Sequence, residues 1–298
     1  MNSFSRGWSF LKEAWKMAFK DKDLLKPSIM SLFAGLIVSI IFIPFMIGAG
    51  FLAGGENGVL GQVTLFVAGA VMIFFQYAVG YIFSAMTVYL VYGYLAEGDG
   101  IMSKAWAVAK RDFFDLMSLA AASTAVNLVK NAIKGKGASG GRNLLAGLVD
   151  TVWMEAAFLL LPAMVIEDIN LKDALKRVGY IIKNNLLLVG LSAVGIRAVN
   201  GLIGFLVGLL GIGLGFAVGY GIISVTGVGS VAGLVSGIGL GVFIAGIFIM
   251  LATVFTSYTA TAYHTCLYLW ARDVEKAQAA GSTAQVPAPA PLAAVLNK

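Results

Sequence analysis

The chain has 298 residues, of which 59% are hydrophobic and 12% are charged, and its formal net charge is +6. In soluble domains about a quarter of all residues are charged, so this composition excludes an ordinary soluble protein and indicates an integral membrane protein. The single histidine and single cysteine, His264 and Cys266, exclude an intrachain disulfide, a Cys₂His₂ zinc site and a Cys-x-x-Cys redox motif. We therefore expect no enzymatic activity, no catalytic residue, no metal site and no cofactor.

Six apolar runs are long enough to cross a membrane, since a spanning helix needs about 20 mostly apolar residues. They cover residues 28–53, 62–95, 113–133, 143–166, 186–222 and 232–271. The pattern predicts an all-α fold, a polytopic transmembrane helix bundle of about six spans. Breaks within the last two runs, which are overlong and rich in glycine, would raise the number of spans to eight.

Basic residues predict how the chain is threaded. Sixteen of the 21 Lys and Arg share one side if both termini are cytoplasmic, which satisfies the positive-inside rule and favours a prokaryotic cytoplasmic (inner) membrane. Four others, Lys130, Lys134, Lys136 and Arg142, lie in the opposite loop between the third and fourth spans. This exception leaves open that the 113–143 hairpin is re-entrant. We expect neither a signal peptide nor a lipid anchor.

An amphipathic basic segment precedes each odd-numbered span, at residues 4–21, 101–112 and 171–184. Such segments form helices at the membrane surface, with the basic face toward anionic headgroups, so we predict interfacial helices on the cytoplasmic side that bind membrane lipids. Residues 1–272 then form one transmembrane domain. It is either a threefold repeat of surface helix and hairpin (1–97, 98–167 and 168–272) or a bundle with ordinary basic loops. Residues 273–298 are predicted to be a flexible, Ala/Pro-rich cytoplasmic tail.

Three motifs resemble a known group of proteins. They are Arg6-Gly7-Trp8-x-x-Leu11-x-x-x-Trp15 with the following Lys20-x-Lys22-Asp23-Leu24-Leu25, the run LLPAMVIED at 160–168 leading into DALKR at 173–177, and TCLYLW at 265–270. Together they look like an uncharacterised family of bacterial and archaeal six-span integral membrane proteins. A fainter similarity extends to the membrane domains attached to some glycerophosphodiester phosphodiesterases. The resemblance implies a fold but no activity, because the catalytic domain of those enzymes has no counterpart here.

Ionisable residues within predicted spans are costly in a bilayer and are candidate functional residues. Glu155 of the fourth span and Arg197 of the fifth lie near mid-depth and are predicted to form a buried ion pair. Asp150 lies at a depth that Lys130 of the third span can reach, which predicts a second pair. The pairs are either a proton- or ion-coupling site or purely structural, with Arg197 extending to water as a further alternative.

Polar side chains form stripes on two predicted spans. On the last span the stripe is Thr253, Ser257, Thr261 and His264, and on the third it is Thr124, Asn127 and Asn131. We interpret the stripes as interhelical hydrogen-bonding groups, with a water-filled path as the alternative. The second span carries Gln76, Tyr77, Tyr81, Ser84, Tyr89, Tyr92 and Tyr94, which we interpret as interhelical contacts plus an inner aromatic belt, with a ligand pocket as the alternative.

Glycines four residues apart are concentrated in the last two spans. These helix-packing candidates are Gly204, Gly208, Gly211, Gly215, Gly219, Gly229, Gly233, Gly237 and Gly241. Such spacing makes a flat helical face that another backbone can approach closely. It predicts that the fifth and sixth spans pack on each other, on neighbouring subunits, or on both.

Two functions fit these patterns. The first is a non-catalytic integral membrane protein that forms a homo-oligomer or joins a membrane complex and organises the surrounding membrane, with anionic headgroups at its inner face. The alternative is a transporter or channel that uses Glu155, Arg197 and Asp150. We expect no nucleic-acid partner, because the topology accounts for the positive charge.

Overall fold

A computed structural model describes residues 3–53, 58–135, 140–227, 230–281 and 286–296; the side chains at 3–4, 182, 184–198 and 294–296 are outside this description. The chain is 92% helical and its described residues contain no strand. The helices are α1 (Ser3–Lys20), the 3₁₀ turn η1 (Lys22–Leu24), α2 (Lys26–Leu52), α3 (Val59–Glu97), α4 (Met102–Arg111), α5 (Phe113–Lys134), α6 (Gly140–Glu167), α7 (Leu171–Thr226), α8 (Val231–Ala279) and α9 (Ala290–Leu296).

Six helices in the described residues are long and apolar enough to cross a membrane. They are α2, α3, α5, α6, the part of α7 from Val199 onward, and α8. The predicted all-α fold and its six candidate spans are therefore confirmed. The last two runs are unbroken, since α7 and α8 are continuous helices of 56 and 49 residues, so the described structure does not contain eight spans.

Local sequence signals set the helix ends. The Asn170 side chain accepts a hydrogen bond from the Asp173 backbone amide at 3.0 Å, and Ser230 accepts one from Gly233 at 3.2 Å, so these residues cap α7 and α8. Helix α3 ends at Gly98, whose φ of +80° lies in the left-handed region that glycine adopts without strain.

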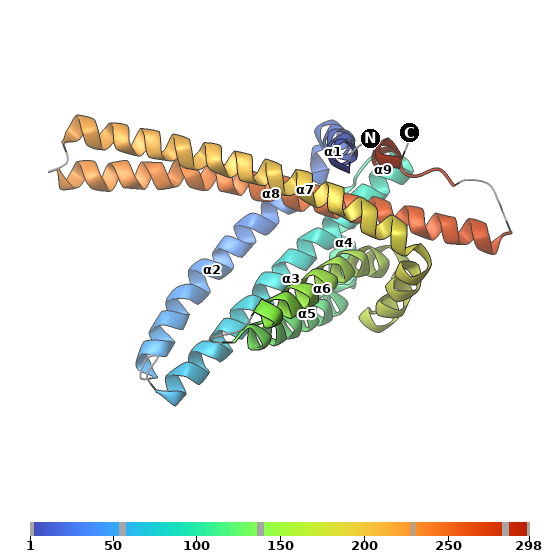
Figure 1. Cartoon of the computed structure of the whole chain (residues 1–298), viewed down its shortest axis with the longest axis horizontal. Helices are drawn as coiled ribbons and strands as arrows, with labels where there is room; N and C mark the ends of the chain where they lie inside the picture. The colour runs from blue at the N-terminus through green and yellow to red at the C-terminus, as the bar shows by residue number, and fades with distance from the viewer. Residues whose placement is uncertain (1–2, 54–57, 136–139, 228–229, 282–285, 297–298) are drawn as a thin grey trace.

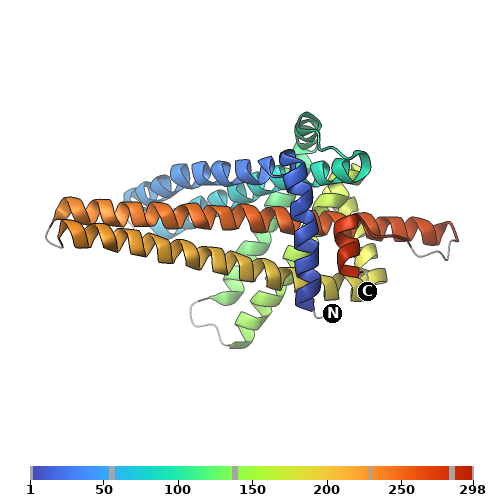
Figure 2. The same cartoon turned by 90° about the horizontal axis from the view of Figure 1, so that it is seen from above.

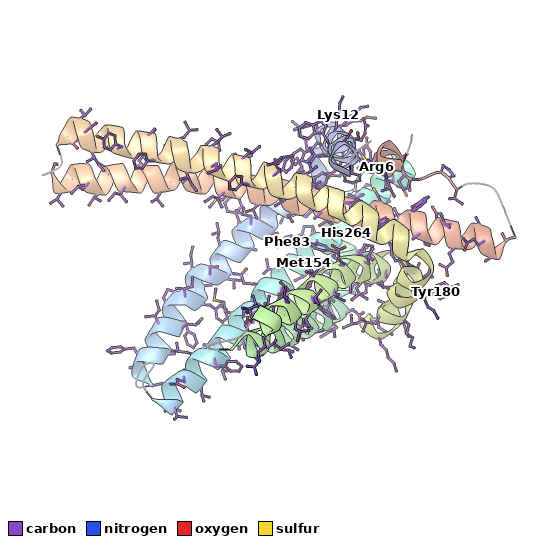
Figure 3. The ribbon with its side chains drawn as sticks, viewed as in Figure 1. Arg6, Lys12, Phe83, Met154, Tyr180 and His264 are labelled. Atoms are coloured by element: carbon purple, nitrogen blue, oxygen red, sulfur yellow. The ribbon has the colours of Figure 1, made fainter. Side chains whose placement is uncertain are left out.

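The long helices form three hairpins, α2–α3, α5–α6 and α7–α8, which converge at one end and separate toward their turns (Figures 1 and 2). We call these turns the hairpin tips and the opposite end, where both chain termini lie, the terminal end. The buried core lies at the terminal end, with Met86–Val91 of α3, Leu159–Val165 of α6 and Tyr258–Leu269 of α8 as its main segments. Toward the tips, the helices expose large apolar side chains (Figure 3).

Helix α1 lies across α7 and α8 and packs on them (Figures 1 and 2). Its buried face includes Phe10, Leu11, Ala14, Met17 and Ala18, whereas the large apolar side chains of Trp8 and Phe19 are 51% and 69% exposed. The small Ala14 allows a close approach, in which Tyr258 Oη of α8 donates a 2.9 Å hydrogen bond to the Ala14 carbonyl. The basic side chains of Arg6 and Lys12 are exposed (Figure 3).

The other two predicted surface segments have different forms. Residues 102–111 form the separate helix α4, but residues 171–184 are the beginning of α7 and are continuous with the fifth span. No proline interrupts the chain between this segment and the span, and α7 is continuous from Leu171 to Thr226.

The C-terminal segment contains a short helix where an extended tail was expected. Helix α8 continues to Ala279, and α9 packs against α1 and α8 with Leu292 fully buried. Trp270 Nε1 donates a 3.3 Å hydrogen bond to the carbonyl of Val286. These contacts hold the segment on the terminal end of the bundle.

The glycines four residues apart allow close contact between α7 and α8 within their hairpin. A Cβ atom added to Gly219 would lie 2.8 Å from the Gly237 carbonyl oxygen, and one at Gly215 would overlap the Gly241 carbonyl. Gly204, Gly211 and Gly233 face the side chains of Thr256, Phe248 and Thr226. A Cβ atom at Gly208 would meet nothing within 4 Å, and Gly229 is outside the described residues.

Candidate functional site

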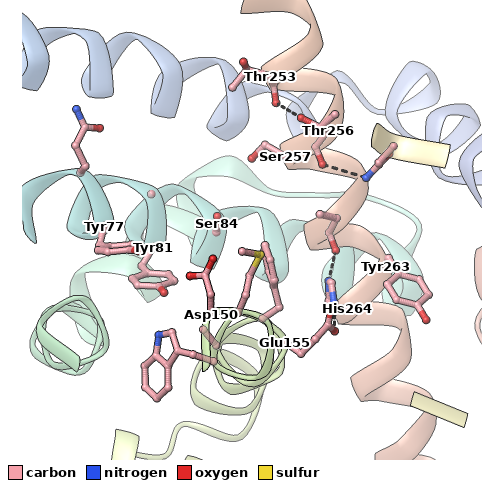
Figure 4. A pocket seen from close by; sticks show the side chains of 18 of the residues that line it. Tyr77, Tyr81, Ser84, Asp150, Glu155, Thr253, Thr256, Ser257, Tyr263 and His264 are labelled. Atoms are coloured by element: carbon pink, nitrogen blue, oxygen red, sulfur yellow. Dashed lines mark hydrogen bonds and ion pairs between the residues drawn. The ribbon is translucent and has the colours of Figure 1, made fainter. Parts of the chain in front are cut away.

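A cavity of about 610 Å³ lies between α3, α6, α7 and α8 (Figure 4). Its lining residues fall at 76–84 on α3, 150–158 on α6, 200–201 on α7 and 253–264 on α8. On α3, α6 and α8 the lining adjoins the buried core on the core's tip-facing side. The core therefore forms the floor of the cavity and separates it from the terminal end.

The α3 wall follows from helical periodicity. Gln76, Tyr77, Gly80, Tyr81 and Ser84 recur at three- and four-residue steps, so they share one face and line the cavity together. The Tyr77 and Tyr81 rings are stacked with centroids 5.9 Å apart. These residues therefore line a cavity, and Gln76 also makes an interhelical contact, because its Nε2 donates to the Gly35 carbonyl at 3.0 Å.

Ser123 of α5 positions two aromatic side chains of the cavity wall. Its Oγ accepts a 3.0 Å hydrogen bond from Trp153 Nε1 and lies 2.7 Å from Tyr81 Oη. One turn further along, Asn127 Nδ2 donates to Tyr77 Oη at 3.4 Å. Ser123 and Asn127 of α5 therefore fix the positions of the Tyr81 and Tyr77 hydroxyl groups.

The predicted α5 stripe omitted Ser123. The residues that matter recur at four-residue steps, Ser123, Asn127 and Asn131, and Asn131 donates to Asn127 Oδ1 at 3.0 Å. Thr124 lies beside this line and donates only to the backbone of Ala120. The regular four-residue spacing of 123, 127 and 131 is the signal in the sequence that could have identified this line.

Glu155 and His264 meet at the floor of the cavity. His264 Nε2 lies 3.3 Å from Glu155 Oε2, and their side chains are 6% and 21% exposed, respectively. The His264 ring stacks on Phe158 with centroids 4.6 Å apart and an interplanar angle of 9°. Stacking and the carboxylate together fix the orientation of the imidazole.

The hydrogen-bond pattern places one proton between these two residues. His264 Nδ1 lies 2.7 Å from the Ala260 carbonyl, which can only accept, so Nδ1 carries a hydrogen. The Nε2–Oε2 contact then needs a second proton, either on the imidazole or on the carboxyl group, because two unprotonated acceptors repel. The pair is thus a protonated histidine with a carboxylate, or a neutral histidine with a carboxylic acid.

The structure brings together the second predicted pair. Lys130 Nζ of α5 lies 2.8 Å from Asp150 Oδ1 of α6, and the lysine side chain is only 15% exposed. Asp150 borders the cavity on its tip-facing side. For the first predicted pair, the side chain of Arg197 is outside the described residues, and the described partner of Glu155 is His264.

The α8 stripe divides between cavity and core. Thr253, Ser257 and His264 line the cavity, whereas Thr261 is 4% exposed and is not among the lining residues. From α7, Asn200 Nδ2 donates to the Thr256 carbonyl at 3.4 Å, while the buried Asn200 Oδ1 accepts no hydrogen bond in the described structure. Polar groups of α7 and α8 therefore line the side of the cavity opposite α3.

Two arginine clusters fasten the terminal end. Arg177 of α7 pairs with Glu167 of α6 at 3.0 Å and with Glu275 of α8. Partial burial lowers the pKa of Arg177, but the hydrogen bonds that the guanidinium donates to Glu167 and Glu275 outweigh this effect, and the pKa is raised. These ion pairs join α6, α7 and α8, three of the helices that line the cavity, on the terminal side of the core floor.

Arg111 makes the second cluster. Its Nε lies 2.6 Å from Asp112 and 3.1 Å from Asp168, and its Nη2 donates to the Val165 carbonyl at 3.3 Å. The hydrogen bond to Asp112 raises the pKa of Arg111. Asp168 has a φ of +53°, an uncommon conformation in the short turn between α6 and α7.

The described residues contain no group of three or more His, Cys, Asp or Glu side chains arranged to hold a metal ion. No protein-family model, no curated protein and no solved structure matches the chain.

Proposed function

We propose that this chain is a non-catalytic membrane protein that binds a small molecule within the bilayer and transports it. The observation that carries the proposal is the cavity of about 610 Å³ between α3, α6, α7 and α8. Ligand sites commonly have this size, with apolar walls and a few placed polar groups. The transporter alternative required such a cavity at Glu155 and Asp150, and both residues line it.

Two pairs of ionisable side chains support transport over a passive structural role. Asp150–Lys130 and Glu155–His264 lie in helices that are long and apolar enough to span a membrane. Ionisable groups at this depth are expensive and mark substrate or proton pathways in many membrane proteins. The shared proton between Glu155 and His264 gives the site a group whose charge distribution changes when the proton moves.

The core floor supports access from one side at a time. In this state the cavity is separated from the terminal end by the packed segments of α3, α6 and α8. Transport then requires a second state in which these segments part, while α1 and the arginine clusters keep the helices together.

Thiol labelling tests this access. The native Cys266 is fully buried, so an introduced cysteine supplies the reactive thiol. In reconstituted protein, Ser257→Cys and Ser84→Cys should react with a membrane-impermeant maleimide added on the side of the hairpin tips. Ser224→Cys and Ser103→Cys, at exposed positions near the α7–α8 tip and on α4, mark the two sides. If the cavity cysteines stay inert to reagent on the tip side while Ser224→Cys reacts from that side and Ser103→Cys reacts from the opposite side, the proposal is wrong.

A second candidate function is assembly into an oligomer or membrane complex that organises the surrounding lipid. Its support is the apolar surface of the hairpins. In the single chain, 0% of the residues in the most apolar 18-residue stretch of α2 are buried, and 6% of those in the corresponding stretch of α8. The α7–α8 glycine contacts do not add support, since they are made within the chain. Native mass spectrometry from lipid nanodiscs should give a multiple of the chain mass with bound anionic lipid; a lipid-free monomer would contradict it.

We further propose that both termini lie on the cytoplasmic side of a prokaryotic inner membrane. An even number of spans places the termini together, and exposed basic residues such as Lys12, Lys16 and Lys104 lie at the terminal end. The Ser103→Cys marker should then react only when the cytoplasmic side is open to reagent.

A further inference from the structure

The cavity contains hydrogen-bonding groups that the described protein residues do not satisfy. Asn200 is 8% exposed, and its Oδ1 has no donor in the described structure, although its Nδ2 is engaged by the Thr256 carbonyl. The hydroxyl groups of Ser84 and Ser257 likewise form no hydrogen bond with described residues, and both line the cavity, from α3 and α8 (Figure 4). A buried acceptor without a partner costs free energy, so the site is suited to a molecule that donates a hydrogen bond.

The ionisable side chains among the described lining residues are already engaged. Asp150 pairs with Lys130 at 2.8 Å, and Glu155 contacts His264 at 3.3 Å. A ligand with a net charge would have to displace one of these partners or remain an unpaired charge in an apolar surrounding, which is strongly unfavourable. This balance favours an uncharged polar group.

Apolar surface continues from the cavity toward the tips. One helical turn toward the tips on the same faces lie Met72 and Ile73 of α3, four residues before Gln76 and Tyr77, and Ile249 of α8, which is four residues before Thr253 and 49% exposed. Within the cavity, Met154 and Phe158 add apolar surface. A hydrocarbon chain attached to the polar group would therefore have apolar surface to follow out of the cavity.

We infer that the cavity binds an uncharged, hydroxyl-bearing amphiphile such as a diacylglycerol, with its hydroxyl headgroup at Asn200, Ser84 and Ser257 and its acyl chains directed toward the hairpin tips. This inference rests on the proposed binding function and specifies its substrate class. A free polyol offers the same hydroxyl chemistry without the chains, so the experiment includes both.

Fluorescence quenching of Trp153 tests the inference, because this indole borders the cavity, while the other four tryptophans lie on α1, α4 and the terminal part of α8. The protein is reconstituted in phosphatidylcholine vesicles with a small fraction of brominated dioleoylglycerol, dioleoylphosphatidic acid or a cationic dioleoyl lipid. The signal is the quenching that disappears in Trp153→Phe. We expect quenching by the diacylglycerol at the lowest mole fraction, and no competition from glycerol at matched concentration.

Two variants with a matched control test the headgroup contacts. Asn200→Leu and the double variant Ser84→Ala/Ser257→Ala should each weaken diacylglycerol quenching about fivefold to tenfold, as expected for one or two lost hydrogen bonds. Ser236→Ala, at an exposed position near the α7–α8 tip, should leave it unchanged. The double variant removes only hydroxyls at half-buried positions, so it keeps the test valid if Asn200→Leu does not fold.

Three results would overturn the inference. Equal quenching by all three lipids, unaffected by the variants, would mean that the cavity accepts only hydrocarbon chains. Preference for phosphatidic acid or the cationic lipid would mean that it selects charge, and full competition by glycerol would replace the amphiphile with a free polyol. None of these results alters the thiol-labelling result, so failure of the inference is distinguishable from failure of the proposed function.

Discussion

The Glu155 carboxylate and the His264 imidazole, 109 positions apart in the chain, face each other at 3.3 Å at the bottom of a cavity between membrane helices. The other imidazole nitrogen is engaged by the Ala260 carbonyl, so the two side chains share one proton. This relationship can be measured directly, because His264 is the only histidine of the chain.

The first prediction concerns the protonation of His264. In protein labelled with ¹⁵N-histidine, NMR should show a hydrogen on Nδ1, and Glu155→Gln should yield the neutral Nδ1–H tautomer, with the glutamine amide donating to Nε2. A neutral Nε2–H tautomer in the unmodified protein would contradict the assigned hydrogen bond to Ala260.

Replacing Ser123 should loosen the aromatic wall. Ser123→Ala removes the acceptor of Trp153 Nε1 and the partner of Tyr81 Oη, so we expect a loss of about 1–3 kcal/mol in unfolding free energy and altered Trp153 fluorescence. Ser118→Ala on the same helix is the control, because Ser118 is exposed and its hydroxyl donates only to the backbone carbonyl of Phe114 one turn earlier. Equal melting of the two variants in one detergent would refute the role of Ser123.

Adding a methyl group to Gly241 should separate α7 from α8. A Cβ there would lie 2.6 Å from the Gly215 carbonyl oxygen, so Gly241→Ala requires the two backbones to move apart and should cost about 1–3 kcal/mol. Gly239→Ala has open space around its new Cβ and should be neutral or stabilising by up to about 1 kcal/mol. Thermal unfolding of both variants decides the matter; a stabilised Gly241→Ala would show that the close approach is not required.

Removing the guanidinium of Arg177 should weaken the terminal end. Arg177→Ala leaves Glu167 and Glu275 without their shared cation, and because all three side chains are partly exposed we expect a loss of about 1–3 kcal/mol. The neighbouring Lys176 pairs with Asp173 at the surface, with 70% of its side chain exposed, so Lys176→Ala should change stability by less than about 0.5 kcal/mol. Chemical denaturation curves that coincide for the two variants would show that the cluster contributes little.

The number of membrane-spanning helices and their approximate bounds could be predicted, because hydropathy and length constrain a spanning segment strongly. The contact between Lys130 and Asp150 was also predictable, since both residues flank one short hairpin and their depths follow from counting residues. Adjacent spans with linked glycine spacing indicated the α7–α8 contact, although the spacing could not distinguish it from a contact between subunits.

The meeting of Glu155 with His264 could not be predicted in the same way. Their helices are not consecutive, and which turn of α8 lies beside Glu155 depends on the tilt of α6 and α8, which a hydrophobic pattern does not fix. The cavity has the same origin, because it exists where hairpins that are joined at one end separate toward the other. The pairing of Glu155 with Arg197 remains a prediction, since that arginine side chain is outside the described residues.

The docking of α9 on α1 has a consequence for how the protein is made. Helix α1 precedes all six candidate spans in the chain, whereas Leu292, which belongs to the same buried cluster as Phe10, follows them all. During synthesis, helix α1 therefore cannot complete its contact with α9 until all six spans have been made.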